Sequence, residues 1–347
     1  AFDIKEDKVK DAIAAMKTFN MRGCNVTMPD KVEAAKYMDE LSPAAQIIGA
    51  INTIVNDNGK LTGHITDGEG FVHNLKDHGI DIKGKKITVA GGGGAATAIQ
   101  VQCALDGARE ITIFNKNDAF FERTLQTAEK IKKAVPDCVV NVYDIDDTAK
   151  MTEEIQSSDI FANATIVGMK PLDDQSVVKD LSAFRPGLVV ADAVYNPEET
   201  KLLREAKEAG CTCIGGKGML LWQGVAAFKL YTGQDMPVED VKKLLSDNLG
   251  LWTKEELKES YEKDLRHRYD KAFSNGEQEM VKSLYAEDEP LANTAVQILN
   301  RIARISWGSG GHSAGYVPLF VLGVGAENFN GKLDNTDIPR QIEALMK

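Results

Sequence analysis

The sequence predicts an α/β protein with a parallel sheet, and three observations support that class. From about residue 67 onward, β-branched runs alternate with segments of helix length. Four consecutive glycines lie between one such run and an apolar, alanine-rich segment, and 43% of the 347 residues are apolar. Alternating strands and helices form right-handed βαβ crossovers around a parallel sheet that is covered on both faces. A chain of this length and composition buries a full core and is expected to form two or three domains.

The first 66 residues are predicted to form a small α/β unit. We expect a short strand at 2–4 and helices at 7–18 and 31–40. The turn residues at 56–59, Asn-Asp-Asn-Gly, separate a run at 49–55 from a second run at 60–64, which is typical of a β-hairpin.

The segment 67–215 is predicted to hold the parallel sheet and its helices. A helix from Thr66 to Ile80 leads into it, and the elements that follow alternate as βαβ units require. The expected strands are 87–90, 111–115, 139–143, 160–164, 189–195 and 211–214, and the expected helices are 95–105, 120–134, 148–157 and 199–209. Two further helices, 223–230 and 238–248, extend the prediction to residue 249.

The glycine-rich stretch after the first of these strands is the main functional signal. Glycine permits positive φ and close approach of a ligand to the main chain, and the new helix attracts an anion such as a pyrophosphate. The spacing departs from the strict G-x-G-x-x-G pattern, so the stretch alone also fits a tight turn without a ligand. About 20 residues further on, a polar cluster follows the strand at 110–115, where a Rossmann unit meets the adenosine ribose. Together these features predict a Rossmann-type dinucleotide domain with cofactor residues Gly91, Gly93, Gly94, Ala95, Asn115, Lys116 and Asp118.

Charge and composition restrict the class of partner and the compartment. A formal net charge of −11 argues against nucleic acid or an anionic membrane as a partner. There is no apolar run long enough for a membrane span, and the first residues lack the features of a signal peptide. Five cysteines, an odd number, fit reduced thiols better than a disulfide framework. The sequence therefore predicts a cytoplasmic protein.

Lys31 and Asp67 are a chemically suggestive pair, because each lies in a turn-like motif rather than on a helix face. Taken alone, they are also compatible with a surface lysine and an N-capping aspartate. With the glycine turn, these motifs closely resemble the shikimate dehydrogenase family, particularly its quinate/shikimate dehydrogenase branch. The resemblance covers residues 1–249 and includes the stretches 25–31, 49–53, 66–70, 163–171, 192–203 and 218–224.

The resemblance implies a dehydrogenase that oxidises or reduces a polyol acid such as shikimate or quinate. Lys31 would be the acid/base, with Asp67 hydrogen-bonded beside it. Residues 1–66 and 216–249 would bind the substrate, and residues 67–215 would bind the dinucleotide. By the same resemblance, Thr27, Asn52 and Gln223 would contact the substrate hydroxyls, Thr165 and Met169 would lie near the cofactor, and Gly218 would lie near its nicotinamide end.

Two features of the sequence bear on the choice between NAD and NADP and on the extent of the substrate domain. Lys116 could meet a 2′-phosphate, whereas Asp118 would repel one and accept a ribose hydroxyl, so we expect NAD with NADP tolerated. The family opens with a strand and helix that carry a Ser-x-Ser motif, and the residues from Ala1 onward match the part after it. We therefore expect a truncated substrate domain, which could pair with another chain as a homodimer.

The stretch 250–347 is expected to be an α+β appendage that resembles the C-terminal part of alkaline phosphatase. In that family the histidine of a Gly-His-Ser/Thr motif binds zinc, so His312 would be a ligand by resemblance only. The serine nucleophile and the other ligands of such a site are absent from the sequence. Two alternatives follow: a catalytically silent composite that joins two family fragments, and a zinc phosphatase fragment.

Overall fold

The computed structural model describes residues 4–118 and 121–249. Residues Ala1–Met236 form one compact unit, and a second unit begins at Pro237. Of this second unit only helix α10 (Val238–Leu249) is described. The predicted region 216–249 therefore extends across the boundary between the two units. The stretch 250–347, with His312 and the alkaline phosphatase resemblance, lies outside the described residues.

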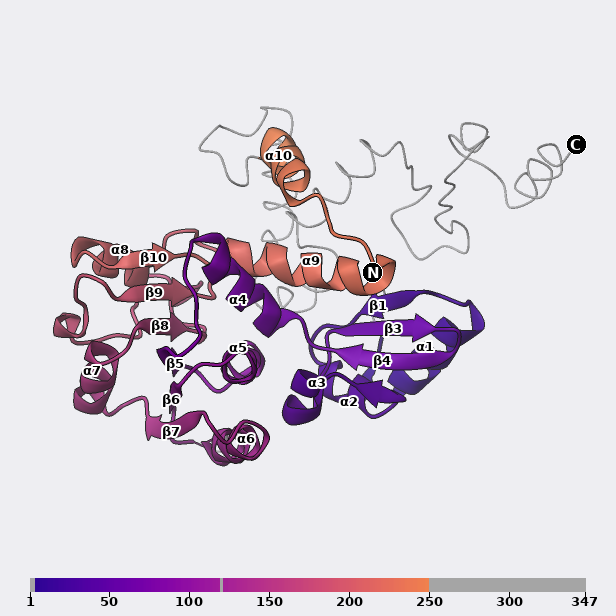
Figure 1. The fold of residues 1–347 in the computed structure, drawn as a ribbon, viewed down its shortest axis with the longest axis horizontal. Helices are drawn as coiled ribbons and strands as arrows, with labels where there is room; N and C mark the ends of the chain where they lie inside the picture. The colour runs from indigo at the N-terminus through magenta and orange to yellow at the C-terminus, as the bar shows by residue number, and fades with distance from the viewer. Residues whose placement is uncertain (1–3, 119–120, 250–347) are drawn as a thin grey trace, which may run out of the picture. The chain divides into compact units, whose positions relative to one another are not determined.

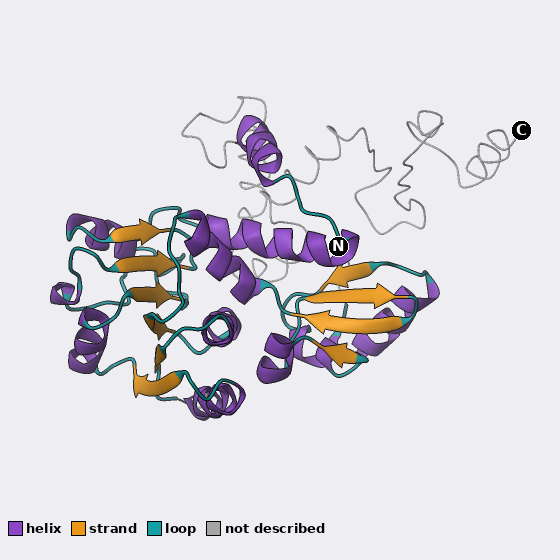
Figure 2. Cartoon of the chain, viewed as in Figure 1, coloured by secondary structure: helices purple, strands orange, loops and turns teal. Residues whose placement is uncertain are grey.

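A four-stranded sheet is built from residues 23–64 (Figures 1 and 2). Its order is β1-β3-β4-β2, with β3 antiparallel to both β1 and β4. The β3–β4 hairpin turns at Asn58 and Gly59, both with positive φ, which is the geometry of a two-residue hairpin loop. The strands are β1 (Gly23–Asn25), β2 (Glu40–Leu41), β3 (Thr53–Asp57) and β4 (Lys60–His64), and the helices are η1 (Glu6–Lys8), α1 (Val9–Thr18), α2 (Lys31–Ala35) and α3 (Pro43–Ile48).

A six-stranded parallel sheet follows, with helices on both of its faces (Figure 2). Its order is β10-β9-β8-β5-β6-β7, so the chain moves outward from β5 in one direction and then returns to extend the other edge. The strands are β5 (Lys86–Ala90), β6 (Glu110–Asn115), β7 (Val139–Asp144), β8 (Ile160–Asn163), β9 (Val189–Asp192) and β10 (Thr212–Ile214). The helices are α4 (Asp67–Asp77), α5 (Gly94–Leu105), α6 (Phe121–Ala134), α7 (Thr148–Gln156), η2 (Leu181–Ala183), α8 (Lys201–Glu208) and α9 (Lys217–Thr232).

Alternate residues of the parallel strands feed two separate cores. Ile111 and Ile113 pack on the face that α5 covers, whereas Phe114 packs on the opposite face with Phe161 and Val190. These side chains are fully buried, as expected for a parallel sheet with helices on both faces. The predicted fold class is confirmed, and the carboxyl ends of the strands form one edge of the sheet.

Helix α9 connects the last parallel strand back to the four-stranded sheet. It packs against α4 and against β3. The α4–α9 crossing is close, because a Cβ at Gly70 would lie 2.5 Å from the Met219 carbonyl oxygen. Arg22 donates from Nε to the Tyr231 carbonyl oxygen at 2.7 Å and so caps the last turn of α9.

Several predicted element boundaries were wrong. The helix expected at 31–40 ends at Ala35, because the chain then turns into β2, and Asp39, directly before that strand, accepts a hydrogen bond at Oδ2 from Leu61 N. Helix α3 was missed, although Ser42 caps its first turn and Gly49 takes the left-handed conformation at its end. The strand expected at 189–195 ends at Asp192, and Ile4 does not lie in a strand.

Candidate functional site

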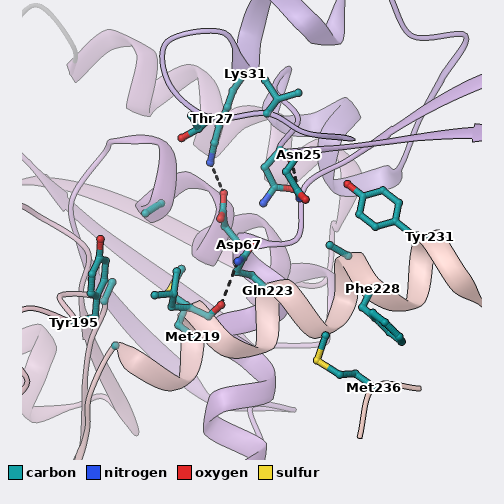
Figure 3. A pocket seen from close by; sticks show the side chains of 18 residues that line it. Asn25, Thr27, Lys31, Asp67, Tyr195, Met219, Gln223, Phe228, Tyr231 and Met236 are labelled. Atoms are coloured by element: carbon teal, nitrogen blue, oxygen red, sulfur yellow. Dashed lines mark hydrogen bonds and ion pairs between the residues drawn. The ribbon is translucent and has the colours of Figure 1, made fainter. Parts of the chain in front are cut away.

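A cleft of about 680 Å³ is lined by residues from both sheet regions and from α9 (Figure 3). The five residues that the sequence assigned to catalysis and substrate binding all line it. It also reaches Ala95 at the start of α5 and Met219 of α9. The five predicted residues are Thr27, Lys31, Asn52, Asp67 and Gln223.

Lys31 and Asp67 face each other across this cleft. Lys31 is the first residue of α2 and Asp67 the first residue of α4, so two short loops position their side chains. Lys31 Nζ donates to Asp67 Oδ2 at 2.7 Å, and the two side chains are 20% and 19% exposed. The carboxylate therefore holds the amine at the wall of a solvent-accessible cleft, where it can exchange a proton with a bound molecule.

Asn52 and Gln223 are positioned through Thr66, the residue before Asp67. Asn52 Oδ1 accepts from Thr66 N at 2.9 Å, and Asn52 Nδ2 donates to Thr66 Oγ1 at 3.0 Å. The Thr66 hydroxyl also reaches Gln223 Oε1 at 3.5 Å. This network joins the residue before the hairpin, the start of α4 and helix α9, and two of its members, Asn52 and Gln223, line the cleft.

The glycine-rich turn has the shape that a phosphate-bearing ligand requires. Gly91 has a φ of +123°, and a Cβ there would lie 2.7 Å from the Ala164 carbonyl oxygen, so this glycine is needed for folding. Gly93 and Gly94 are different, because a Cβ at either position would meet nothing within 4 Å. Gly93 is the N-cap of α5 and has no side chain to satisfy the first amides of that helix. The open space and the helix N-terminus together fit the pyrophosphate of a dinucleotide.

The end of β6 lies beside this turn. Asn115 is the last residue of β6, and its Nδ2 donates to Thr124 Oγ1 at 2.9 Å. A Cβ at Gly92 would lie 2.5 Å from both Asn115 Nδ2 and Thr124 Oγ1, so Asn115 packs directly on the turn. Lys116 and Asp118 follow in the next loop, where the Asp118 amide donates to the Lys116 carbonyl oxygen at 2.9 Å. Asn115 is thus adjacent to the predicted pyrophosphate site, and Lys116 and Asp118 follow it in the chain.

The remaining predicted residues occupy the carboxyl edge of the sheet. Thr165 follows β8, and its Oγ1 donates to Asn163 Oδ1 at 2.7 Å. Met169 is 43% exposed. Gly218 lies in the first turn of α9, where a Cβ would overlap the Asn74 side chain. Packing against Asn74 alone therefore explains why residue 218 is glycine, and its predicted place near the cofactor is a separate expectation.

Sequence reasoning missed several residues that line the cleft, among them the polar or aromatic residues Asn25, Tyr195, Phe228 and Tyr231 (Figure 3). Burial raises the pKa of the Tyr231 phenol above its usual range. Asn25 and Tyr195 belong to stretches that the resemblance covers, so that signal was available for them. Phe228 and Tyr231 lie on α9 among other apolar residues, and only its packing on β3 identifies the side that faces the cleft.

The fold and the cleft define a two-sheet α/β protein of the Rossmann type, whose glycine-rich turn fits a dinucleotide. Two family models match the chain: the shikimate dehydrogenase substrate binding domain at residues 1–54 and the shikimate 5′-dehydrogenase C-terminal domain at residues 216–245. The chain is 48% identical over 245 residues to a shikimate dehydrogenase (NADP(+)) of Listeria monocytogenes, covering 71% of this chain and 84% of the relative. It is 49% identical to a quinate/shikimate dehydrogenase of Escherichia coli, covering 71% of this chain and 85% of the relative. The chain belongs to the shikimate dehydrogenase family.

Solved structures agree with this assignment. Shikimate 5-dehydrogenase from Listeria monocytogenes, in complex with shikimate and NAD, matches with a TM-score of 0.69 and 48% identity, covering 71% of this chain and 84% of that chain. Quinate dehydrogenase from Corynebacterium glutamicum, in complex with NAD, matches with a TM-score of 0.61 and 30% identity, covering 67% of this chain and 80% of that chain.

The same comparisons leave some expectations without support. The substrate-binding-domain model matches from residue 1, which does not support the expected truncation of that domain. They give no support to the alkaline phosphatase resemblance or to the composite and phosphatase alternatives. Among the described residues, none of the helices has the length and apolar character that crossing a bilayer demands. The homodimer and the cytoplasmic location stay predictions.

Proposed function

We propose that this protein is an NAD(P)-dependent dehydrogenase that oxidises a secondary alcohol of shikimate or quinate, or reduces the corresponding ketone. One observation carries the proposal: Lys31, Asp67 and Ala95 line the same cleft. Ala95 lies in the first turn of α5, directly after the glycine turn that fits a pyrophosphate. The pair that can exchange a proton and the start of the predicted dinucleotide site therefore line the same cleft. In this proposal residues 67–215 bind the dinucleotide, and residues 1–66 and 216–249 bind the acid.

Lys31 is the acid/base of the proposed reaction. In the oxidation direction the neutral amine accepts the hydroxyl proton as the carbonyl forms, and in the reduction direction the ammonium returns it. Asp67 keeps Nζ in place through the 2.7 Å hydrogen bond. A nicotinamide dinucleotide held at the glycine-rich turn would supply the hydride chemistry of the same reaction.

The other cleft residues orient the polyol. Thr27, Asn52 and Gln223 present a hydroxyl and two amides, which can donate to and accept from the hydroxyl groups of a cyclic polyol. Two hydrogen bonds to Thr66 hold Asn52 beside Asp67, and Gln223 contacts the same threonine hydroxyl at 3.5 Å. This arrangement favours a substrate with several hydroxyls on one ring over a simple alcohol.

We infer that NAD is the main cofactor and that NADP is tolerated. Asp118 would accept hydrogen bonds from an adenosine ribose and repel a 2′-phosphate, whereas Lys116 would attract one. Relatives of this family are named for NADP(+) or have structures that contain NAD, so the family accommodates both dinucleotides.

The test is reduction of NAD⁺ and NADP⁺ by the full chain with shikimate and with quinate, followed by nicotinamide absorbance. We expect turnover with at least one acid, and a loss of about 10²–10⁴-fold in kcat for Lys31→Ala. Lys36→Ala is the matched control, because Lys36 follows α2, is 62% exposed and pairs with Glu33 instead of Asp67. Full turnover by the Lys31 variant, or no reduction by folded wild type, would overturn the proposal.

A further inference from the structure

Asp192 is a buried carboxylate that the proposed reaction does not use. It ends β9 and is 2% exposed. Its carboxylate accepts hydrogen bonds from Thr200 Oγ1 at 2.7 Å, Asn163 Nδ2 at 2.9 Å and Val194 N at 3.0 Å. These donors are uncharged, and burial raises the pKa of Asp192 to about 6 despite them. A buried carboxylate held only by such donors costs free energy, which points to a role for the geometry that it imposes.

Asn163 extends this geometry toward the glycine turn. It ends β8 directly beside Asp192 and is 1% exposed. Its Nδ2 also donates to the Val167 carbonyl oxygen at 3.0 Å, and its Oδ1 accepts from Thr165 N at 3.1 Å. The turn 164–167 is therefore fixed to the carboxylate through one amide side chain. That turn packs on Gly91, since a Cβ there would lie 2.7 Å from the Ala164 carbonyl oxygen.

A second set of contacts extends from Asp192 toward the cleft. The bond to Val194 N sets the path of the chain directly after β9, and Ala193 and Tyr195 on either side of it line the cleft. Helix α9 begins against the same segment, because a Cβ at Gly216 would lie 2.5 Å from the Ala193 carbonyl oxygen. The carboxylate thus fixes one wall of the cleft as well as the turn beside the glycines.

We propose that Asp192 is a positioning residue. Its one buried carboxylate fixes the position of the dinucleotide-side turn 164–167 relative to the cleft wall 193–195. The proposal rests on the proposed function, since it assigns the turn to the dinucleotide and the wall to the acid. Asp192 acts through Asn163 and Val194, and it touches neither ligand.

The experiment compares Asp192→Ala, Asn163→Ala, their double variant and wild type, all as the full chain. Dinucleotide Kd is measured by titration of NADH fluorescence without turnover, and substrate KM is measured by nicotinamide absorbance. Asp192→Ala should raise both constants by about tenfold, which corresponds to the loss of one well-placed buried hydrogen bond. Asn163→Ala should raise the dinucleotide Kd alone. The double variant should bind the dinucleotide no more weakly than Asp192→Ala, because both changes release the same turn.

Asp159→Asn is the matched control. Asp159 precedes β8 at the opposite end of the sheet, and its Oδ2 accepts from Lys86 N at 2.9 Å. This variant should leave both constants unchanged while testing the general effect of neutralising a sheet-edge carboxylate.

Each outcome decides the question. Unchanged constants in folded Asp192→Ala, or an additive double variant, overturn the positioning role. If Asp192→Ala does not fold, an unchanged dinucleotide Kd in Asn163→Ala overturns it. Wild type that binds NADH without turnover refutes the proposed reaction but leaves the Kd comparison decisive, whereas wild type that does not bind NADH refutes both.

Discussion

Replacement of Gly94 by alanine should separate the stability of this protein from its affinity for a dinucleotide. Gly94 is the first residue of α5 and does not have positive φ, and a Cβ there would meet nothing within 4 Å. Alanine in a helix is more stable than glycine by roughly 0.5–1 kcal/mol, so the free energy of unfolding should rise slightly. The same methyl group would occupy the space that a pyrophosphate needs. We expect dinucleotide binding to weaken by at least about tenfold, which is roughly 1.4 kcal/mol.

Urea denaturation and NADH fluorescence titration measure the two effects on the same samples. Gly224→Ala is the comparison variant, because Gly224 lies within α9, on the proposed acid-binding side of the cleft, and its Cβ would also meet nothing within 4 Å. It should give a similar gain in stability without a change in dinucleotide Kd. If Gly94→Ala binds NADH as tightly as wild type, the open space above the turn is not the pyrophosphate site, and the reasoning is refuted.

Two further predictions concern charge. Asp118→Ala should raise the ratio of kcat/KM for NADP⁺ to kcat/KM for NAD⁺ by about tenfold, because it removes a negative charge near the expected 2′-phosphate. Steady-state rates with both dinucleotides measure this ratio, and an unchanged ratio contradicts the prediction. Burial raises the pKa of Asp192 to about 6 from 3.8, so the folded chain holds a proton that the unfolded chain has lost between these values. The stability contributed by the protonated group is fully present below pH 3.8 and is lost as the pH rises through 6. Relative to Asp192→Asn, wild type should therefore lose roughly 2 kcal/mol of unfolding free energy from pH 4 to pH 7. If the urea midpoints of the two proteins change with pH in parallel, this expectation is excluded.

The parallel sheet was predictable because its signal is local and repeated. Each strand is a short apolar run, and every crossover except β8–β9, which has only η2, contains an α-helix, so the alternation specifies most of the elements and their parallel pairing. The short elements at 31–48 were harder to predict. Helix α2 has five residues and β2 has two, and their limits depend on contacts such as Asp39 with Leu61 that lie far apart in the sequence.

The sequence allowed the residues of the candidate site to be predicted, but not the distances and hydrogen bonds between them. The glycine-rich turn identifies Gly93 and Gly94 by residue type and position, whereas the role of Lys31 was predicted through the family resemblance. The 2.7 Å bond between Lys31 and Asp67 depends on how α2 and α4 are placed, and the contact of Thr66 with Gln223 depends on how α9 returns to the hairpin. The acceptor role of Asp192 was not predictable, because a single aspartate at the end of a strand carries no sign of a donor at the end of β8 and two donors from the segment that follows β9.

The return of α9 to the first sheet determines the order in which the protein can be completed during synthesis. All six parallel strands end by Ile214, whereas Gln223 and the remaining α9 side chains of the cleft are made later. Domains generally fold as units while the chain is still being made, at about 5–20 residues per second. The glycine turn can therefore be in place on a nascent chain whose cleft still lacks one wall. The capacity to bind a dinucleotide should precede the capacity to bind an acid substrate, and completion of the site waits for the α4–α9 contact.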